Sequence, residues 1–208
     1  MATAAQQQQF ISQLVDAIRQ QSDNYGLFPS VIMGQAIVES GWGQSGLSKN
    51  YNNYFGMKAS SSQFSPFWIP NVSPVSQMLT REVVNGNDIT VNANWRVYNS
   101  LAESIADHNA LIGKAKRYAA ALTARTPREQ LQAIKNGGYA TAPNYVDTIM
   151  NVIDRYNLTQ YDNIKPEGTI TAGGKKKAYR VLLAVGIVFV AVAAALAVFL
   201  IVKRKKLK

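Results

Sequence analysis

The chain of 208 residues contains no cysteine and a single histidine, His108. Without cysteine it can form no disulfide bond, bind no metal through thiolates and use no thiol as a nucleophile. One histidine cannot build a zinc site of several histidines, and no partner pattern for a serine triad surrounds it. We therefore expect His108 to lie on a helix surface or to pack in the core, and we expect neither a metal nor an organic cofactor.

Acidic residues are almost missing from the C-terminal tail. Residues 1–162 carry 12 Lys and Arg against 11 Asp and Glu, a net charge of +1, whereas residues 163–208 carry 10 against one, a net charge of +9. The formal net charge of +10 therefore belongs mainly to the tail. A nucleic-acid ligand would require the positive charge on the folded domain. The charge distribution thus argues against nucleic acid as a partner.

The tail also holds a long uncharged hydrophobic run, at residues 181–202, with basic residues on both sides. At about 1.5 Å per residue, a helix of this length matches a hydrocarbon core of about 30 Å. We predict a flexible basic linker over residues 163–177 and a transmembrane helix with basic flanks over residues 178–208. The predicted partner of residues 181–202 is a lipid bilayer, and the basic flanks suit anionic headgroups but leave the orientation open.

Residues 29–43 predict a short buried helix that ends in a carboxylate. Ser30 is a candidate N-cap, and Gly41 and Gly43 end the helix, because glycine tolerates the left-handed conformation of a C-terminal cap. Glu39 lies in the last turn on a largely apolar stripe, so desolvation should raise its pKa, as a general acid near neutral pH requires. The alternative is that Glu39 only caps the helix or forms an ion pair.

The remainder of residues 1–162 predicts more helices and one β-hairpin, which makes the fold class α+β, mostly α. Asn-Gly between two β-rich runs predicts the hairpin, and Ser or Thr three residues before Glu predicts helix starts. The predicted elements are an amphipathic helix over residues 6–21, strands over residues 78–84 and 88–98, helices that open at Ser100-Leu-Ala-Glu103 and Thr126-Pro-Arg-Glu129, a helical segment over residues 118–122, and a last helix that ends near Tyr156.

A loop over residues 60–76 is rich in serine and proline and contains Phe64, Phe67 and Trp68. Three aromatic side chains in one loop indicate either the wall of a cleft or a small satellite core beneath the loop. The sequence supports these two interpretations equally.

Two sequence blocks connect the chain to a known family. The block Gln35-Ala-Ile-Val-Glu-Ser-Gly-Trp-Gly-Gln-Ser-Gly-Leu-Ser48 is followed by Asn52-Asn-Tyr-Phe-Gly-Met-Lys58. Their order and separation resemble the signature of glycoside hydrolase family 73, the bacterial and phage N-acetylglucosaminidases of peptidoglycan in the lysozyme-like superfamily. The resemblance extends over residues 9–162 and leaves out the tail.

The resemblance implies a lysozyme-like helical domain over residues 1–162 with a small β-hairpin lobe. It implies that Glu39 is the catalytic acid. In the family, a glutamate of a Thr-x-Glu segment in the hairpin is the proposed second catalytic carboxylate, and Thr80-Arg-Glu82 matches that segment. Taken by itself, Glu82 would be a solvated residue on a strand.

The same resemblance assigns candidate substrate contacts. Asn52, Asn53 and Tyr54 follow the catalytic helix in the family motif, although Asn53 is also suited to a tight turn. The segment Gly138-Tyr-Ala-Thr-Ala-Pro-Asn-Tyr145 matches a second family pattern. It implies a substrate-orienting role for Tyr139 and, less directly, for Tyr145, for which ordinary aromatic packing is the alternative.

By resemblance the expected activity is cleavage of the β-1,4 bond between N-acetylglucosamine and N-acetylmuramic acid, with peptidoglycan glycan strands as the partner and no metal or cofactor. The alternatives are a lytic transglycosylase of the same superfamily and a non-catalytic glycan-binding membrane protein. Residues 1–9 lack the basic start and the apolar run of a secretory signal. We therefore expect the virion membrane of a membrane-containing phage, in host entry or lysis, with a bacterial cell envelope as the alternative.

Overall fold

The computed structural model describes residues 2–59, 64–70, 73–84 and 87–167, with the backbone alone for residues 79–84 and 87–91. The chain divides into two units, residues 1–170 and 171–208. The predicted transmembrane segment, residues 178–208, and most of the predicted linker lie outside the described residues. Within the described part of the chain, no helix is both long enough and apolar enough to cross a membrane.

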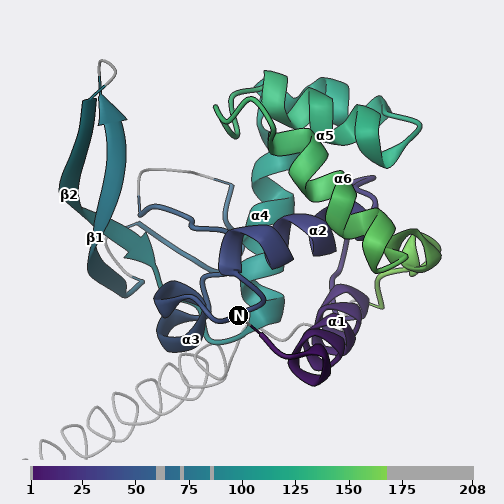
Figure 1. The fold of residues 1–208 in the computed structure, drawn as a ribbon, viewed down its shortest axis with the longest axis horizontal. Coiled ribbons are helices and arrows are strands. Elements are labelled where there is room, and N and C mark those ends of the chain that lie inside the picture. The colour runs from purple at the N-terminus through teal and green to yellow at the C-terminus, as the bar shows by residue number, and fades with distance from the viewer. Residues whose placement is uncertain (1, 60–63, 71–72, 85–86, 168–208) are drawn as a thin grey trace, which may run out of the picture. The chain divides into compact units, whose positions relative to one another are not determined.

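The described residues are mostly helical and include one antiparallel two-stranded sheet, so the predicted class is confirmed (Figure 1). The α-helices are α1 (Ala4–Arg19), α2 (Pro29–Ser40), α3 (Gly46–Tyr51), α4 (Leu101–Lys114), α5 (Pro127–Asn136) and α6 (Tyr145–Arg155). The strands are β1 (Val75–Val84) and β2 (Asn87–Arg96), and the 3-10 helices are η1 (Lys116–Thr123) and η2 (Leu158–Tyr161).

Helix α2 lies at the centre of the helical part and packs against α1, α5, α6 and η2. Its residues from Pro29 to Ile37 are all buried. Gly34 permits the close approach of α6, because a Cβ atom added there would lie 2.7 Å from Cγ2 of Ile149. The burial predicted for this helix is therefore confirmed, and it follows from apolar residues on all sides.

The two ends of α2 differ in how well the sequence predicts them. Gly41 is the C-cap, in the left-handed conformation at φ 57°, as predicted. The N-cap prediction was wrong: Phe28 is the N-cap and Pro29 occupies the first turn. Ser30 lies inside the helix, where its backbone N–H and its hydroxyl donate to the carboxylate of Asp162 at 2.8 and 3.0 Å. Proline at the first helical position needs no side-chain cap, since its missing N–H is one of the unpaired groups.

The short helix α3 was not predicted, because six residues are too few to show a periodic pattern. Ser45 caps its start by accepting a hydrogen bond from the N–H of Ser48 at 3.1 Å. Asn52 ends it in the left-handed conformation at φ 51°. The loop that follows α3 thus begins at this left-handed asparagine.

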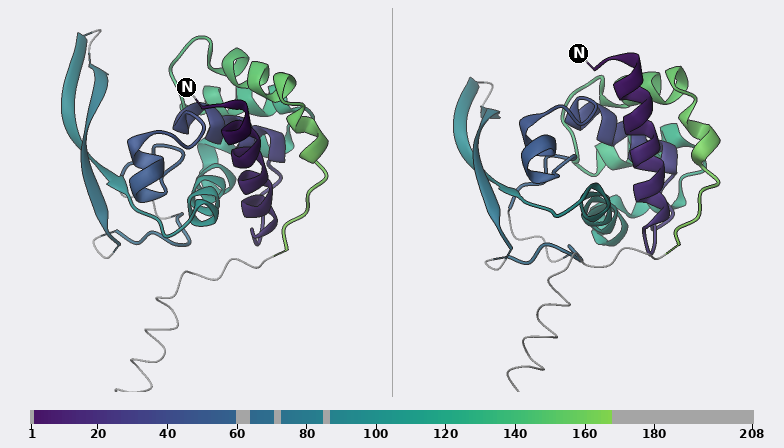
Figure 2. Two further views of the ribbon diagram at one scale, coloured as in Figure 1. Left: turned by 60° about the horizontal axis from the view of Figure 1, so that its bottom comes forward. Right: turned by 90° about the horizontal axis from the view of Figure 1, so that it is seen from below.

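The predicted β-hairpin is confirmed: β1 begins three residues earlier than expected and ends at Val84 as expected, and β2 begins one residue and ends two residues earlier. Strand β1 starts at Val75, and β2 ends at Arg96. The Asn-Gly turn at residues 85–86 lies outside the described residues. At the base, Ala59 donates its N–H to the carbonyl of Asn94 at 2.7 Å, and Arg96 donates to the carbonyl of Met57 at 3.0 Å. Figures 1 and 2 show the hairpin to one side of the helices.

A buried polar network ties the hairpin base to α4. The guanidinium of Arg96 donates to the carboxylate of Asp107 at 2.6 Å, and both side chains are almost fully buried. The hydroxyl of Tyr98 donates to the same carboxylate oxygen. The ring of Trp68 lies 4.6 Å from the guanidinium. Because a buried charge requires a partner, this network fixes where the hairpin leaves the helical part.

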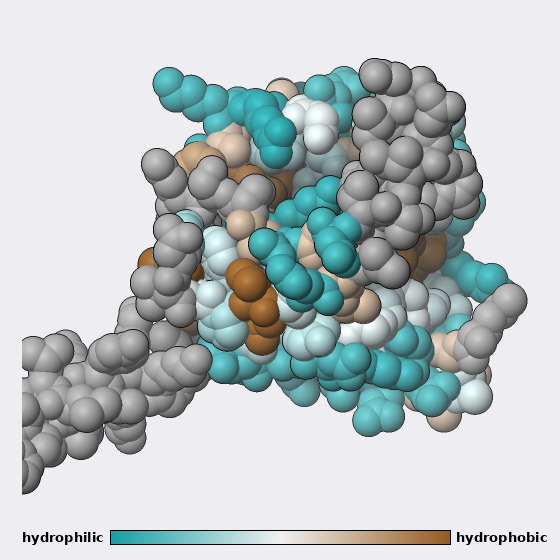
Figure 3. All heavy atoms as spheres, turned by 90° about the vertical axis from the view of Figure 1, so that its left-hand side faces the viewer, coloured by the Kyte–Doolittle hydropathy of each residue, from teal (hydrophilic) through white to brown (hydrophobic). Residues whose placement is uncertain are grey.

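The surface on the hairpin side is mainly polar. Figure 3 shows this face with hydrophobic side chains in small groups between hydrophilic ones. Among the described residues, the exposed large hydrophobic ones are Ile69 and Val75, close to the hairpin base.

Helix α1, predicted over residues 6–21, begins and ends two residues earlier, whereas α4 and α5 begin where predicted. Ser100 and Thr126 each accept a hydrogen bond from the backbone N–H of the glutamate three residues later, Glu103 and Glu129, at 3.2 Å. The helical segment predicted over residues 118–122 is part of η1, a 3-10 helix. Helix α5 ends before Gly137 and Gly138, and α6 begins only at Tyr145. The segment between them is therefore free to line a cavity.

Candidate active site

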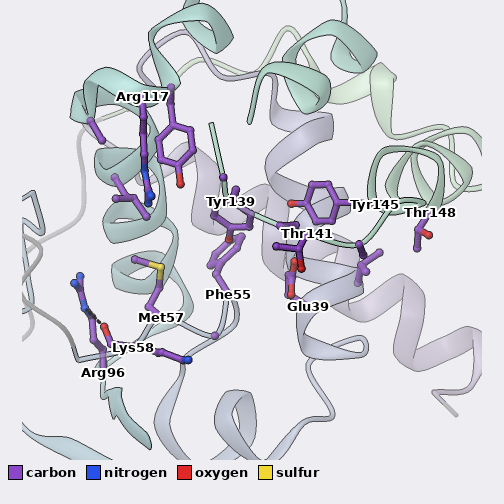
Figure 4. Close-up of a pocket in the computed structure, with 18 of the residues that line it drawn as sticks. Glu39, Phe55, Met57, Lys58, Arg96, Arg117, Tyr139, Thr141, Tyr145 and Thr148 are labelled. Carbon is purple, nitrogen blue, oxygen red and sulfur yellow. Dashed lines mark hydrogen bonds between the residues drawn. The ribbon is translucent and has the colours of Figure 1, made fainter. Parts of the chain in front are cut away.

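A cavity of about 1110 Å³ opens between the end of α2, the α3 loop, the hairpin base, and the segments around η1 and α6 (Figure 4). The residues that line it come from five parts of the chain. They are Val38 and Glu39; Phe55, Gly56, Met57, Lys58 and Phe64; Trp95 and Arg96; Leu111, Ala115, Arg117 and Tyr118; and Gly138, Tyr139, Ala140, Thr141, Ala142, Asn144, Tyr145 and Thr148. A volume of this order suits a ligand of several sugar rings better than a small metabolite.

Glu39 lies in the last turn of α2 and points into this cavity (Figure 4). Its side chain is exposed to solvent, although Gln35 and Ala36, one turn before it, are buried. The walls of the cavity nevertheless remove part of the water around its carboxyl group, and this desolvation raises the pKa of Glu39 above its ordinary value, as predicted. A group in a concave site can touch water and still lose part of its hydration. Glu39 is therefore suited to hold a proton and to donate it.

Tyr145 lies beside Glu39 and is held by α2. The amide of Gln35, one turn before Glu39, donates to the hydroxyl of Tyr145 at 2.8 Å. Burial is the main cause that raises the pKa of Tyr145, and the charge of Glu39 adds to it. The other amide atom, Oε1 of Gln35, is buried and has no hydrogen-bond partner among the described residues. Gln35 thus orients Tyr145 next to the acid.

Tyr139 lies at the centre of an aromatic cluster that forms one wall. Its ring centroid lies 5.6 Å from that of His108, 6.1 Å from that of Tyr145 and 6.4 Å from that of Tyr118. Its hydroxyl oxygen is buried and has no partner within the described part of the chain. Burial, followed by the neighbouring Tyr145 and Glu39, holds the pKa of Tyr139 well above its usual value. The hydroxyl therefore remains protonated and keeps a hydrogen bond to give.

His108 packs in the core, one of the two places expected for it. It is completely buried in α4, and its ring stacks on Phe55 at a centroid distance of 4.1 Å. Burial lowers the pKa of His108 to about 4. The imidazole is therefore neutral and supports the aromatic wall from behind.

Asn52, Asn53 and Tyr54 do not line the cavity. Asn53 is buried, and its amide bonds three backbone groups: it donates to the carbonyls of Met57 and Arg96 at 2.9 and 3.0 Å and accepts from the N–H of Met57 at 2.9 Å. Asn52 donates to the carbonyl of Tyr98 at 3.1 Å. These asparagines hold the loop to the hairpin base, so the turn interpretation of Asn53 accounts for its position.

Tyr54 packs against helix α1 and does not line the large cavity. Its ring stacks on Phe10 of α1 with centroids 5.7 Å apart. With Asn52, it lines a smaller cavity of about 370 Å³ beside α1 and the start of α4. Asn52, Asn53 and Tyr54 are therefore not placed to contact a substrate in the large cavity.

Glu82 belongs to β1, where it pairs with Ile89 of β2. Its side chain lies outside the described part of the structure. In the pairing register, Trp95 of the cavity wall stands opposite Ser76, six residues before Glu82. At a rise of about 3.3 Å per residue, the Cα of Glu82 is about 20 Å further along the strand. Its role as a second carboxylate stays a prediction.

The aromatic loop divides between its two expected roles. Phe64 lines the cavity. Trp68 is buried against Arg96, and its indole N–H donates to the carbonyl of Pro74 at 3.3 Å. One residue of the loop is thus a cleft wall and another belongs to a satellite core.

Sequence reasoning missed several residues of the cavity. Gln35 does not itself line the cavity, but it holds Tyr145 there through its amide, a contact that the motif alone does not reveal. Lys58 and Arg117 bring positive charge, and Thr141 and Thr148 bring hydroxyl groups. Arg117 carries no sequence signal, because it lies on a 3-10 helix that only the tertiary structure brings beside the cavity.

Comparisons with known proteins find relatives of similar sequence. The chain is 33% identical to the exo-glucosaminidase LytG of Bacillus subtilis (strain 168) over 166 residues, 77% of this chain and 55% of that protein. It is 36% identical to the peptidoglycan hydrolase FlgJ of Salmonella typhimurium over 150 residues, 70% of this chain and 45% of that protein. The chain thus spans about half the length of these curated relatives.

Solved structures show the same fold. The catalytic domain of the autolysin Auto from Listeria monocytogenes matches with a TM-score of 0.64 at 30% identity, over 78% of this chain and 90% of that domain. A C-terminally truncated glycoside hydrolase domain of Salmonella typhimurium FlgJ matches with a TM-score of 0.57 at 35% identity, over 73% of this chain and 97% of that domain. Residues 15–158 match the glucosaminidase family, described as mannosyl-glycoprotein endo-beta-N-acetylglucosaminidase, and the chain belongs to this family.

Proposed function

We propose that this protein is a peptidoglycan hydrolase that cleaves the β-1,4 bond between N-acetylglucosamine and N-acetylmuramic acid. The observation that carries the proposal is one carboxylic acid, Glu39, with a raised pKa, in a long cavity walled by aromatic rings and hydroxyl groups. Aromatic faces stack on sugar rings, and hydroxyl and amide groups bond to sugar hydroxyls. Family membership and the names of the relatives support a glycosidase acting on peptidoglycan.

Glu39 acts as the general acid. Its raised pKa keeps the proton on the carboxyl group nearer to neutral pH than an ordinary glutamate would. It gives this proton to the glycosidic oxygen as the bond breaks, and positive charge then builds on the anomeric carbon. General acid catalysis of this kind contributes about 10²- to 10⁴-fold to the rate.

Tyr139 and Tyr145 orient the sugar beside Glu39. The hydroxyl of Tyr145 receives a hydrogen bond from Gln35, so its own proton is directed away from α2 and toward the cavity. The hydroxyl of Tyr139 has no hydrogen-bond partner among the described residues. A sugar acetamido oxygen or hydroxyl is the chemical partner that both groups fit.

Glu82 is proposed as the second carboxylate, which activates water from the far side of the sugar or stabilises the developing charge. Two carboxyl groups about 5–5.5 Å apart indicate a retaining nucleophile, and about 6.5–9.5 Å an inverting pair. Participation of the substrate's own acetamido group is a third route, which requires no second carboxylate close to Glu39.

A lytic transglycosylase is the second candidate, since it needs one glutamate and forms an anhydro product. The observation in its favour is that Glu39 is the sole carboxylate among the described residues that line the cavity. A glycan-binding protein without activity is disfavoured, because binding alone gains nothing from an acid with a raised pKa.

The test is a digest of purified peptidoglycan by the full chain, beside Glu39→Gln and Glu82→Gln, with the products read by mass spectrometry. New reducing-end N-acetylglucosamine that disappears in Glu39→Gln supports the proposal. Anhydro-muramic ends, with Glu82→Gln still active, support the transglycosylase instead. Binding without cleavage by the unaltered protein would leave a glycan-binding module.

We also propose that residues 181–202 anchor the enzyme in a membrane, since this run is uncharged and flanked by basic residues. The virion membrane of a membrane-containing phage is the proposed location, and a bacterial cell envelope is the alternative. Detection of the protein in purified virions supports the first, whereas detection only in membranes of uninfected cells supports the second. A chain that stays in the supernatant after ultracentrifugation of membranes would contradict the anchor.

A further inference from the structure

The charges of the cavity are unevenly distributed around Glu39. Three basic residues line it, Lys58, Arg96 and Arg117, against the one described acid. In Figure 4 all three lie on one side of Glu39, and Tyr145 and Thr148 lie on the other. The basic residues of the cavity are therefore gathered in one half of it, although residues 1–162 as a whole are nearly neutral.

The three cations differ in their partners. Arg96 is neutralised, because its guanidinium is buried against the carboxylate of Asp107 at 2.6 Å. Lys58 lies with its ammonium 5.7 Å from the ring centroid of Trp95. Arg117 is exposed, and within the described residues its recorded contact is the ring of Tyr118, 4.6 Å away. Among the described residues, no carboxylate forms an ion pair with Arg117.

The backbone at Arg117 and the ring of the next residue, Tyr118, are closely packed. The Tyr118 ring beneath Arg117 is completely buried. A Cβ atom added to Gly137 would lie 2.4 Å from that ring and 2.8 Å from the carbonyl oxygen of Arg117. The end of α5 thus fixes η1 at this position. A guanidinium that is stacked on an ordered ring loses little freedom on binding, and its planar fork matches a carboxylate.

We infer that Arg117 recognises a carboxylate of the acidic substituent that the muramic sugar carries, and so determines which half of the cavity receives that sugar. The inference rests on the proposed function. The carboxylate has two sources: the side chains and the end of the stem peptide, or the lactyl group that becomes free when the stem is removed. In both cases a neutral half-cavity binds the remaining sugars through Tyr145 and Thr148.

The experiment measures kcat and KM of the full chain on soluble, uncross-linked glycan strands in three forms. These are strands with intact stem peptides, strands stripped of stems by an amidase, and intact strands whose carboxylates have been converted to neutral amides with a carbodiimide and methylamine. The variants are Arg117→Gln, Arg117→Lys and the matched control Arg125→Gln, which removes an exposed arginine away from the cavity.

We expect Arg117→Gln to raise KM about tenfold on stem-bearing strands, corresponding to about 1.4 kcal/mol, with kcat little changed. Arg117→Lys should restore part of the loss, and Arg125→Gln should match the unaltered protein. On the amidated strands Arg117→Gln and the unaltered protein should have equal KM values. While the stem is attached, the lactyl carboxyl is held in an amide bond and carries no charge. A defect on stem-bearing strands that disappears on stripped strands therefore identifies the stem, and a defect on stripped strands alone identifies the lactyl carboxylate.

An equal loss on native and amidated strands would overturn the inference, because Arg117 would then act through packing or neutral hydrogen bonds. So would an unchanged KM on both native and stripped strands. If the unaltered protein cleaved none of the three substrates, the proposed function itself would fail, which is a separate outcome from either of these.

Discussion

Glu39 and Glu82, the two carboxylates proposed for catalysis, lie on elements that differ in how they are supported. Glu39 ends a helix that is packed on all sides and capped by Gly41. Glu82 belongs to a sheet of two strands whose hydrogen bonds to the rest of the domain gather at its base. A two-stranded hairpin has little stability of its own. Glu39 is therefore positioned by the helical core, whereas the position of Glu82 depends on the hairpin.

The largest expected effect tests the helix side of this comparison. Glu39→Gln keeps the shape of the side chain but removes the proton that the reaction needs. We expect peptidoglycan cleavage to fall by about 10³- to 10⁴-fold, measured as release of reducing ends. The circular dichroism spectrum should stay unchanged. Activity within tenfold of the unaltered protein would show that another residue supplies the proton.

The next effect breaks the base of the hairpin. Arg96→Met leaves the carboxylate of Asp107 buried without its cation, so the free energy of unfolding should fall by about 3–5 kcal/mol. Denaturant unfolding of the full chain, followed by tryptophan fluorescence, measures it. The double variant Arg96→Met with Asp107→Leu should recover much of the loss, since no charge then remains unpaired. A loss below about 1 kcal/mol for the single variant would contradict the structural role of this pair.

A smaller effect is expected at the hairpin carboxylate. Glu82→Gln should lower kcat by about 10²-fold if the residue activates water or stabilises charge, because such a role is worth less than 3 kcal/mol. Its thermal unfolding temperature should equal that of the unaltered protein. Full activity in Glu82→Gln would remove this residue from the mechanism and favour substrate assistance or the transglycosylase reaction.

The smallest expected effect is on how the thermal unfolding temperature depends on pH. Because the folded-state pKa of Glu39 is raised above 4.5, the folded protein binds this proton more tightly than the unfolded chain does. Stability therefore decreases as pH rises through the window between the ordinary and the raised pKa. Glu39→Gln lacks this loss, so it should unfold at a slightly higher temperature than the unaltered protein at pH 7 and at the same temperature at pH 3.5. A lower unfolding temperature at pH 7 would contradict the raised pKa.

Local patterns predicted much of the fold. The left-handed Gly41 at the end of α2, the β-hairpin and the starts of α4 and α5 depend on a few neighbouring residues, and all of them are observed. The errors arose where local signals compete. Ser30 is a good cap by residue type, yet Pro29 starts the helix one position earlier and leaves the serine to bind Asp162.

The site was predicted in part, for a similar reason. Glu39, Tyr139 and Tyr145 were found from the family motifs that contain them, and all three line the cavity. Asn53 belongs to the same motif, but its amide is fully used by the backbone of Met57 and Arg96. A motif therefore identifies residues that are needed together without separating those that touch a substrate from those that hold the loop.

The sequence by itself determined the helical class, the hairpin, the helix that carries Glu39 and the charge imbalance between the domain and the tail, since each follows from nearby residues or from composition. Only the tertiary structure decided that Gln35 holds Tyr145, that His108 is buried and neutral, and that Arg117 stands over Tyr118 on the far side of the cavity from Thr148. These contacts join segments far apart in the chain, and their geometry depends on how the helices pack around α2, which no local pattern encodes.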